Sequence, residues 1–179
     1  MSDPSPSAQD FYQTLRDKVD QQFDHIYNKY PNAFQCGKQC HACCQPDLSI
    51  SQLEADGIKL YLHTQPHLVE QLKQLQQKNP HKNQRCEFLD KSGLCSIYPV
   101  RPLICRSHGA PILVQIDKKK EALDCCPLNF EEGLQDLQPG DWIHLETLNT
   151  MLTLINRYQP SHSDTGKRVA LMIDALLTD

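Results

Sequence analysis

Four cysteines stand within nine residues of this chain, in the stretch CGKQCHACC at positions 36–44. Thiols at this density constrain the fold, because they must bind a metal, form disulfides or pack as small apolar side chains in the core. The chain of 179 residues contains nine cysteines in all, namely Cys36, Cys40, Cys43, Cys44, Cys86, Cys95, Cys105, Cys125 and Cys126. An odd number cannot pair completely within one chain, which disfavours a disulfide framework.

The composition and the N-terminal sequence indicate the compartment and exclude some partners. Apolar residues make up 39% of the chain, and no segment approaches the ~18 apolar residues of a membrane span. The opening MSDPSPSAQD is polar, and no apolar signal-peptide core follows it. We therefore expect a cytoplasmic protein without a membrane partner, in a compartment that keeps thiols reduced. The net charge is −4 and the one basic run is Lys118–Lys120, so the sequence lacks the clustered basic residues that are typical of nucleic-acid binding.

Helical signals cover most of the first 80 residues. Apolar residues recur at helical spacing and predict a first helix that ends near residue 30, namely Phe11, Leu15, Val19, Phe23 and Ile26. Ser51 and Glu54 form a predicted capping box that opens a second helix, which runs to about Leu62. Pro66 suits the first turn of a third helix.

The chain between residues 85 and 126 reads as two β-hairpins. The first is centred on Asp90–Gly93, and its expected register places Phe88 opposite Cys95, with Cys86 on the same face. Two thiols at that diagonal spacing suit one metal better than a disulfide. The second hairpin pairs residues 112–117 with residues 121–126, which would return its two cysteines towards Cys105 and His108.

The fold class follows from these elements. Asp141 is a predicted N-cap for a long helix that includes Trp142, and a last short helix is expected at residues 169–176. We expect a single mostly helical α+β domain over residues 1–179, with helices packed around a small irregular β region. Its predicted parts are a loose tail at residues 1–9, a cysteine-bearing metal core at residues 36–127, and C-terminal helices at residues 139–179.

The spacing of the thiols favours a metal. Cysteines separated by two or three residues can approach to the ~3.5–4 Å that tetrahedral Zn–S bonds require. Neighbours such as Cys43 and Cys44, or Cys125 and Cys126, point apart, so one member of each pair faces another ligand set or the core. Nine thiols exceed one mononuclear site, which leaves a polynuclear centre or two sites open. Soft thiolates select zinc, Cu(I) or iron–sulfur clusters, and the spacing matches no ferredoxin run.

Residues beside the cysteines offer second roles. Arg101 and Arg106 flank Cys105, where a guanidinium would lower thiol pKa values, or would brace a loop through hydrogen bonds. His41 and His108 are candidate imidazole ligands. Tyr98 and Trp142 are expected in the core. No Gly-rich phosphate loop and no Gly-x-Ser-x-Gly elbow is present, so nucleotide hydrolysis and serine esterase chemistry have no support.

The two cysteine blocks resemble the bacterial YkgJ-type cysteine-cluster family, whose members are described as zinc- or iron-chelating domains. The first block is CGKQCHACC, and the second, CSIYPVRPLICR, matches that family at Cys95, Tyr98, Arg101, Pro102, Cys105 and Arg106. The resemblance covers roughly residues 36–127 and implies a bound zinc or iron. A similar cluster in flagellin lysine N-methylase is associated with an iron–sulfur centre and S-adenosylmethionine chemistry.

Three functions are consistent with these features. The favoured one is a cytoplasmic metal-binding protein whose clustered thiolates chelate zinc or iron. The second is an iron–sulfur enzyme with redox or methyltransferase-like activity, which the surplus of thiols and the nearby arginines motivate. The third is a non-catalytic module that uses a zinc-stabilised surface to bind another protein.

Overall fold

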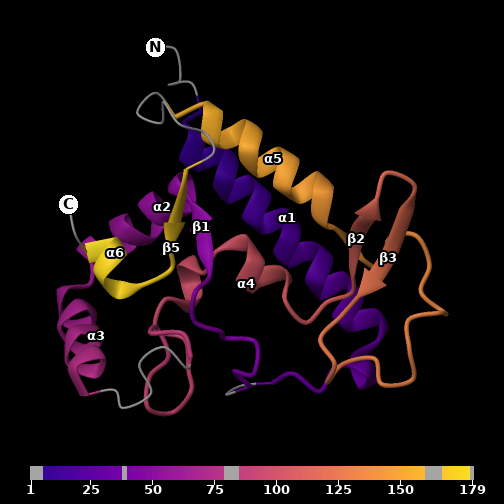
Figure 1. The fold of residues 1–179 in the computed structure, drawn as a ribbon, viewed down its shortest axis with the longest axis horizontal. Helices are drawn as coiled ribbons and strands as arrows, with labels where there is room; N and C mark the ends of the chain where they lie inside the picture. The colour runs from indigo at the N-terminus through magenta and orange to yellow at the C-terminus, as the bar shows by residue number, and fades with distance from the viewer. Residues whose placement is uncertain (1–5, 38–39, 79–84, 160–166, 178–179) are drawn as a thin grey trace. The chain divides into compact units, whose positions relative to one another are not determined.

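The computed structural model describes residues 6–37, 40–78, 85–159 and 167–177 (Figure 1). The chain is α+β and mostly helical, as the sequence predicted. Its residues group into two compact units, which we call the first unit (Met1–Gly37 with Leu103–Pro160) and the second unit (Lys38–Pro102 with Ser161–Asp179). Residues 1–5 of the expected tail lie outside the described residues.

The longest helix of the first unit is α1 (Ala8–Lys29). It begins at a capping box in which Ser7 and Asp10 each accept a hydrogen bond from the backbone N–H of the other, so it starts inside the expected tail. Leu15, Val19 and Ile26 face the core as predicted. Phe11 is 42% exposed and Tyr12 is buried in its place, because the tertiary contacts rotate the buried stripe by one position at this end.

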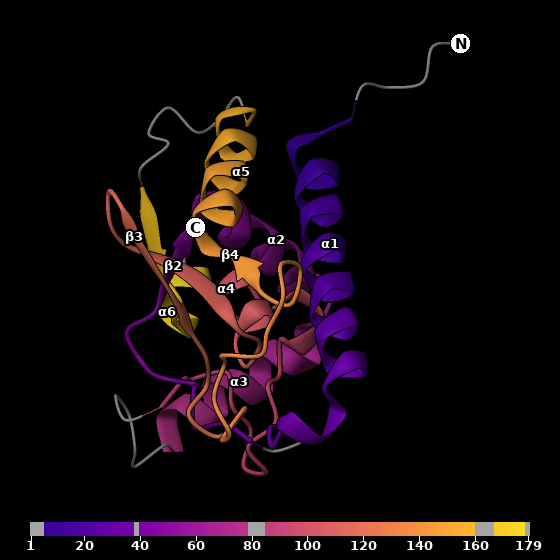
Figure 2. The same ribbon diagram turned by 90° about the vertical axis from the view of Figure 1, so that its right-hand side faces the viewer.

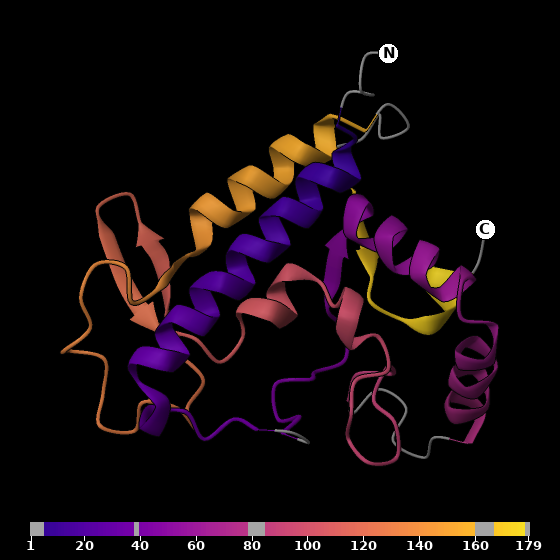
Figure 3. The same cartoon turned by 180° about the vertical axis from the view of Figure 1, so that it is seen from behind.

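The described residues of the first unit also form a small sheet, two further α-helices and the 3-10 helix η1 (Pro31–Ala33). Strand β2 (Ile112–Asp117) pairs antiparallel with β3 (Lys120–Asp124), which confirms the second hairpin, and parallel with β4 (Ile143–His144). Strand β4 leads directly into α5 (Leu145–Arg157), as Figure 2 shows. Helix α5 packs on β2 and lies antiparallel to α1, and α1 also contacts α4 (Leu103–Ser107) (Figure 3).

Asp141 does not cap α5, which corrects the sequence prediction. The helix begins four residues later, after His144, and the Asp141 carboxylate accepts hydrogen bonds at 2.8 Å from Lys29 Nζ and 2.6 Å from Tyr30 Oη. Burial by itself raises the pKa of this carboxyl, but those bonds and one from the Gln138 N–H outweigh it and lower the pKa to about 2. Asp141 therefore ties the end of α1 to the chain before β4.

The described residues of the second unit form a two-stranded sheet, three α-helices and the 3-10 helix η2 (Tyr98–Val100). Strand β1 (Ser49–Ser51) pairs antiparallel with β5 (Arg168–Ala170). Helix α2 (Gln52–His63) follows β1, and it packs against α3 (Pro66–Lys78) and α6 (Ile173–Leu177). The predicted capping box at the start of α2 is confirmed by hydrogen bonds in both directions between its serine and glutamate.

Two predictions for the second unit are wrong. Residues 169 and 170, which were expected to begin the last helix, form part of β5 because β1 pairs with them, and the helix begins only at Ile173. The expected hairpin after Arg85 is a turn-rich loop with one isolated bridge, between Leu89 and Cys95. The bridge shifts the expected register by one residue, and the turns replace regular strands.

No helix in the described residues combines the length and the apolar character of a membrane-spanning segment.

Candidate metal centre

All nine cysteines lie among the described residues, and none is in a disulfide. Only Cys126 is buried, Cys40 is exposed, and the other seven are half-buried. Small apolar side chains of a core would be buried more fully, so this pattern disfavours the interpretation as a cysteine-rich core. Half-buried thiols at the edge of a fold are accessible to a cation.

In the first unit, Cys36 and Cys126 bring their sulfur atoms together. The two Sγ atoms are 3.8 Å apart although the residues are separated by 90 positions. Two ligands of a tetrahedral metal with Zn–S bonds of ~2.3 Å stand about 3.8 Å apart, whereas bonded disulfide sulfurs lie at about 2.05 Å. The pair therefore has the spacing of two metal ligands.

A buried amide fixes the backbone on both sides of this pair. Asn129, which is 4% exposed, accepts hydrogen bonds through Oδ1 from the backbone N–H groups of Gln35 at 2.9 Å and Cys36 at 3.2 Å. Its Nδ2 donates to the Gly109 carbonyl at 2.7 Å, and its own N–H donates to the Cys126 carbonyl at 2.9 Å. Aromatic packing supports the same segment, because the Phe34 ring contacts Phe130 edge-on, with centroids 5.2 Å apart.

The other two cysteines of the first unit lie on neighbouring elements. Cys125 donates a hydrogen bond from Sγ to the Gly109 carbonyl at 3.3 Å, so the second hairpin returns it to the residue after His108, close to the expected place. Cys105 lies in α4, and the adjacent Arg106 is buried and forms an ion pair with Asp20 of α1. Arg106 therefore braces α4 against α1.

In the second unit, the end of the first cysteine block meets the start of the loop that replaces the first hairpin. The N–H of Cys86 donates to the Cys44 carbonyl at 2.9 Å, and the N–H of Cys44 donates to the His41 carbonyl at 2.9 Å. The first bond joins chain segments far apart in sequence, and the second closes a tight turn over residues 41–44. Backbone hydrogen bonds thus bring Cys44 and Cys86 close together.

Residues 86–95 form a loop that its own polar groups close. Asp90 accepts hydrogen bonds through Oδ1 from the N–H groups of Ser92 at 2.7 Å and Leu94 at 2.9 Å, and Gly93 adopts a φ of 79° that favours glycine. Phe88 is fully buried beneath the loop. The loop is also tied to α6, because the Glu87 carboxylate accepts a hydrogen bond from the Ile173 N–H at 2.9 Å.

Burial raises the pKa of several thiols. It is the largest cause at Cys86 and at Cys125, where the pKa rises to about 11, and it also raises the pKa of Cys95. Repulsion from Cys95 adds to the rise at Cys86. Thiols that stay protonated at neutral pH are poor nucleophiles, and only a nearby cation would stabilise their thiolate forms.

Arg101, which flanks Cys105 in sequence, also acts on Cys95. Its positive charge partly offsets the rise that burial causes in the pKa of Cys95. Its guanidinium lies 4.2 Å from the centroid of the Tyr98 ring. Tyr98 is 58% exposed, so its predicted core position is wrong, because the ring serves as a surface platform for the arginine. Trp142 is half-buried and donates a hydrogen bond to His144, which also departs from the predicted core position.

His41 and His108 are both exposed. Within the part of the chain that the structure describes, no three or more His, Cys, Asp or Glu side chains are arranged to hold a metal ion together. The structure places two thiol sulfur atoms in contact, those of Cys36 and Cys126 in the first unit.

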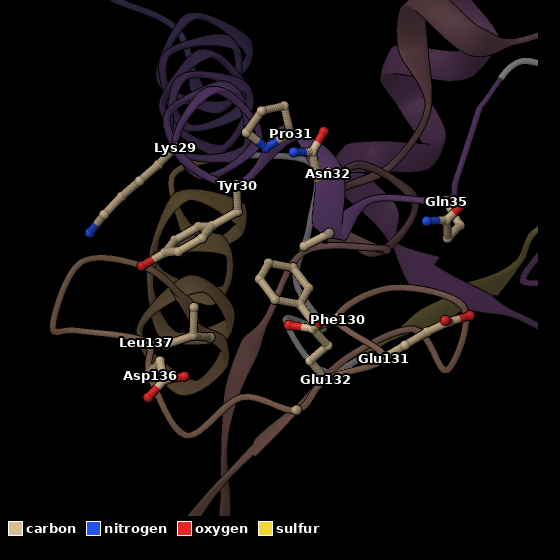
Figure 4. Close-up of a pocket in the computed structure, with 12 residues that line it drawn as sticks. Lys29, Tyr30, Pro31, Asn32, Gln35, Phe130, Glu131, Glu132, Asp136 and Leu137 are labelled. Atoms are coloured by element: carbon tan, nitrogen blue, oxygen red, sulfur yellow. The ribbon is translucent and has the colours of Figure 1, made fainter.

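A pocket of about 440 Å³ opens in the first unit beside the segment that leads to Cys36 (Figure 4). Figure 4 shows the rings of Tyr30 and Phe130 on its wall, with Glu131, Glu132 and Asp136 around them. The pocket is lined by charged, aromatic, amide and small apolar residues, and no cysteine is among those described. The pocket is a neighbour of the thiol pair and does not supply its ligands.

The donor set fits zinc or iron. Thiolate sulfur is a soft ligand, and the 3.8 Å separation of two sulfurs matches one edge of a tetrahedral site. Structure and donor chemistry together define an α+β protein with thiol sites suited to a soft metal. The chain belongs to the CxxCxxCC family, whose model matches residues 35–135 and is described as "Putative zinc- or iron-chelating domain". No curated protein and no solved structure shows a significant match.

Sequence reasoning identified the cysteines but missed Asn129 and Gly109, which hold the first thiol pair. Asn129 stands in the run CCPLN, where an amide after a proline is an ordinary turn signal. Gly109 adopts a φ of 100°, which favours glycine. In the sequence, however, a glycine soon after a cysteine is an equally ordinary feature. Neither signal by itself indicates that the residue contacts a segment dozens of positions away.

Proposed function

We propose that this protein is a thiolate metal-chelating protein that holds zinc or iron through its clustered cysteines. The family match supports metal binding by residues 35–135, and the Sγ–Sγ distance of 3.8 Å between Cys36 and Cys126 is the observation that carries the finer proposal. All nine cysteines are proposed ligands, in one polynuclear centre or in more than one site. A reducing compartment such as the cytoplasm suits such ligands, because disulfide formation would remove them.

A bound zinc would supply structural cross-links, and a bound iron could also supply redox chemistry. The residues of the chain provide thiolate charge, and burial provides a medium in which an unneutralised thiolate is unfavourable. Chelation therefore stabilises the loops that carry the cysteines.

Elemental analysis of protein purified without oxygen tests the proposal, together with a visible spectrum. We expect at least one equivalent of zinc or iron per chain, and a chelator should lower the thermal unfolding midpoint. Zinc leaves the protein colourless because its d shell is full, whereas an iron–sulfur cluster gives a brown protein. Less than about a tenth of an equivalent of any transition metal would refute the proposal.

A further inference from the structure

The Cys36–Cys126 pair is a built arrangement and not a chance approach of two side chains. Cys126 is 9% exposed, and its sulfur is 3.8 Å from that of Cys36. The segment that carries Cys36 and the turn that carries Cys126 are each fixed by hydrogen bonds to one residue, Asn129. Two sulfurs at the edge length of a tetrahedral site are thus held in place before any cation arrives.

The orientation of the Asn129 amide follows from its partners. Its Oδ1 faces two backbone N–H donors, from Gln35 and Cys36, and its Nδ2 faces the Gly109 carbonyl. The flipped amide would set donors against donors, so one orientation satisfies all three groups. Asn129 therefore locks the backbone on both sides of the thiol pair.

Gly109 places a third segment against the pair. A Cβ at this position would lie 3.9 Å from the Cys36 sulfur and 3.4 Å from Asn129 Nδ2, so the backbone passes close to both. Its carbonyl accepts hydrogen bonds from Asn129 and from the Cys125 thiol. Hydrogen-bonded backbone thus lies next to the pair, as it does beside metal ligands whose orientation it fixes.

We propose that Cys36 and Cys126 are adjacent ligands of one tetrahedral zinc or ferrous site in the first unit, and that Asn129 is its positioning residue. This inference rests on the proposed function and adds to it the ligand pair and the residue that orients the pair. It also separates Cys36 in role from the cysteines at positions 40–44, which follow it in sequence. Cys105 and Cys125 belong to the same unit and are the proposed sources of further ligands.

Cobalt(II) is the probe for this site, because it occupies tetrahedral thiolate sites and absorbs in the visible range. We expect Cys36→Ser and Cys126→Ser each to remove a share of the cobalt absorption of the full-length protein. The double variant should lose no more than the larger single loss, because both residues bind one ion. Additive losses, or spectra unchanged from the wild type, would overturn the proposal.

Asn129→Ala tests the positioning role with both thiols intact. We expect about 10- to 100-fold weaker cobalt binding and a changed absorption band, because the loss of a residue that orients metal ligands typically weakens metal binding by this factor. Asn156→Ala is the matched control, because Asn156 is a buried asparagine of the same unit, on α5, at 1% exposure. Equal effects of the two substitutions on affinity and band shape would overturn the positioning role.

A measurement on the wild type covers variants that fail to fold. Alkylation mapped by mass spectrometry should show Cys36 and Cys126 becoming protected together at the same cobalt concentration. Protection of one without the other, or of neither while the protein binds cobalt, would overturn this inference and leave the proposed function standing. If the wild type binds no zinc, iron or cobalt, the proposed function fails and this inference fails with it.

Discussion

The two units hold their neighbouring cysteines in different ways. In the first unit, a buried side-chain amide joins segments that carry Cys36 and Cys126, which are 90 positions apart. In the second unit, Cys86 and Cys95 lie in one loop that closes through its own turn, with the Asp90 carboxylate as the acceptor. The first arrangement depends on the folded unit, whereas the second is largely local. Interactions that matter at one site should therefore matter little at the other.

The largest expected effect is that of Phe88→Ala in the second unit. Phe88 is 0% exposed and anchors the loop from below, so its truncation should lower the free energy of unfolding by about 3–5 kcal/mol. Denaturant unfolding measures the loss. Phe11→Ala is the control, since Phe11 is 42% exposed, and its cost should be much smaller. Equal losses would mean that the core does not support the loop.

Asn129→Ala should come next, measured on metal-free protein. It removes the acceptor of the Gln35 and Cys36 N–H groups and one donor to the Gly109 carbonyl, which keeps its bond from the Cys125 thiol, at a cost of about 2–4 kcal/mol in the free energy of unfolding. Asn149→Ala, at an exposed position on α5, should change stability by less than about 0.5 kcal/mol. A small loss for Asn129→Ala would show that the amide does not hold the first unit together.

Acid should weaken the first unit through Asp141. Its pKa in the folded chain is about 2, below the ordinary value of 3.8, so the stabilisation is complete above about pH 4 and is lost as the pH falls through 2. The thermal unfolding midpoint should decline over that range in the wild type. In Asp141→Asn it should start lower at neutral pH and decline less. Parallel pH profiles of the two proteins would contradict this role.

The smallest expected effect is that of Asp90→Ala. The carboxylate closes a turn at the surface, where water can satisfy the two released N–H groups, so the loss should be only about 1 kcal/mol. Denaturant unfolding measures this loss of stability, and Lys91→Ala, a substitution at the exposed neighbouring residue, is the control. A loss as large as that of Asn129→Ala would mean that the exposed Asp90 carboxylate stabilises its unit as strongly as the buried Asn129 amide stabilises the first unit.

Local signals in the sequence predicted the elements that local physics controls. The capping box of Ser51 and Glu54 and the spacing of Leu15, Val19 and Ile26 correctly gave α2 and the buried face of α1. The hairpin of β2 and β3 was also correct, because its two strands are neighbours in sequence. These features depend on residues a few positions apart, whose preferences do not require the rest of the fold.

Features that depend on distant partners were missed. Strand β5 exists because β1 lies beside it, and Asp141 binds Lys29 and Tyr30 instead of capping the helix that follows it. In each case a tertiary contact outweighed an intrinsic preference of the order of 1 kcal/mol or less.

The sequence by itself determined the donor chemistry that this protein offers, because it contains nine thiols, six of them in two ordered blocks, and thiolate sulfur prefers soft metals. Only the tertiary structure decided that Cys36 stands beside Cys126 with Asn129 holding the backbone of both. Side-chain type is written in single residues, but a sulfur–sulfur distance across 90 positions is set by every contact that folds the chain between them.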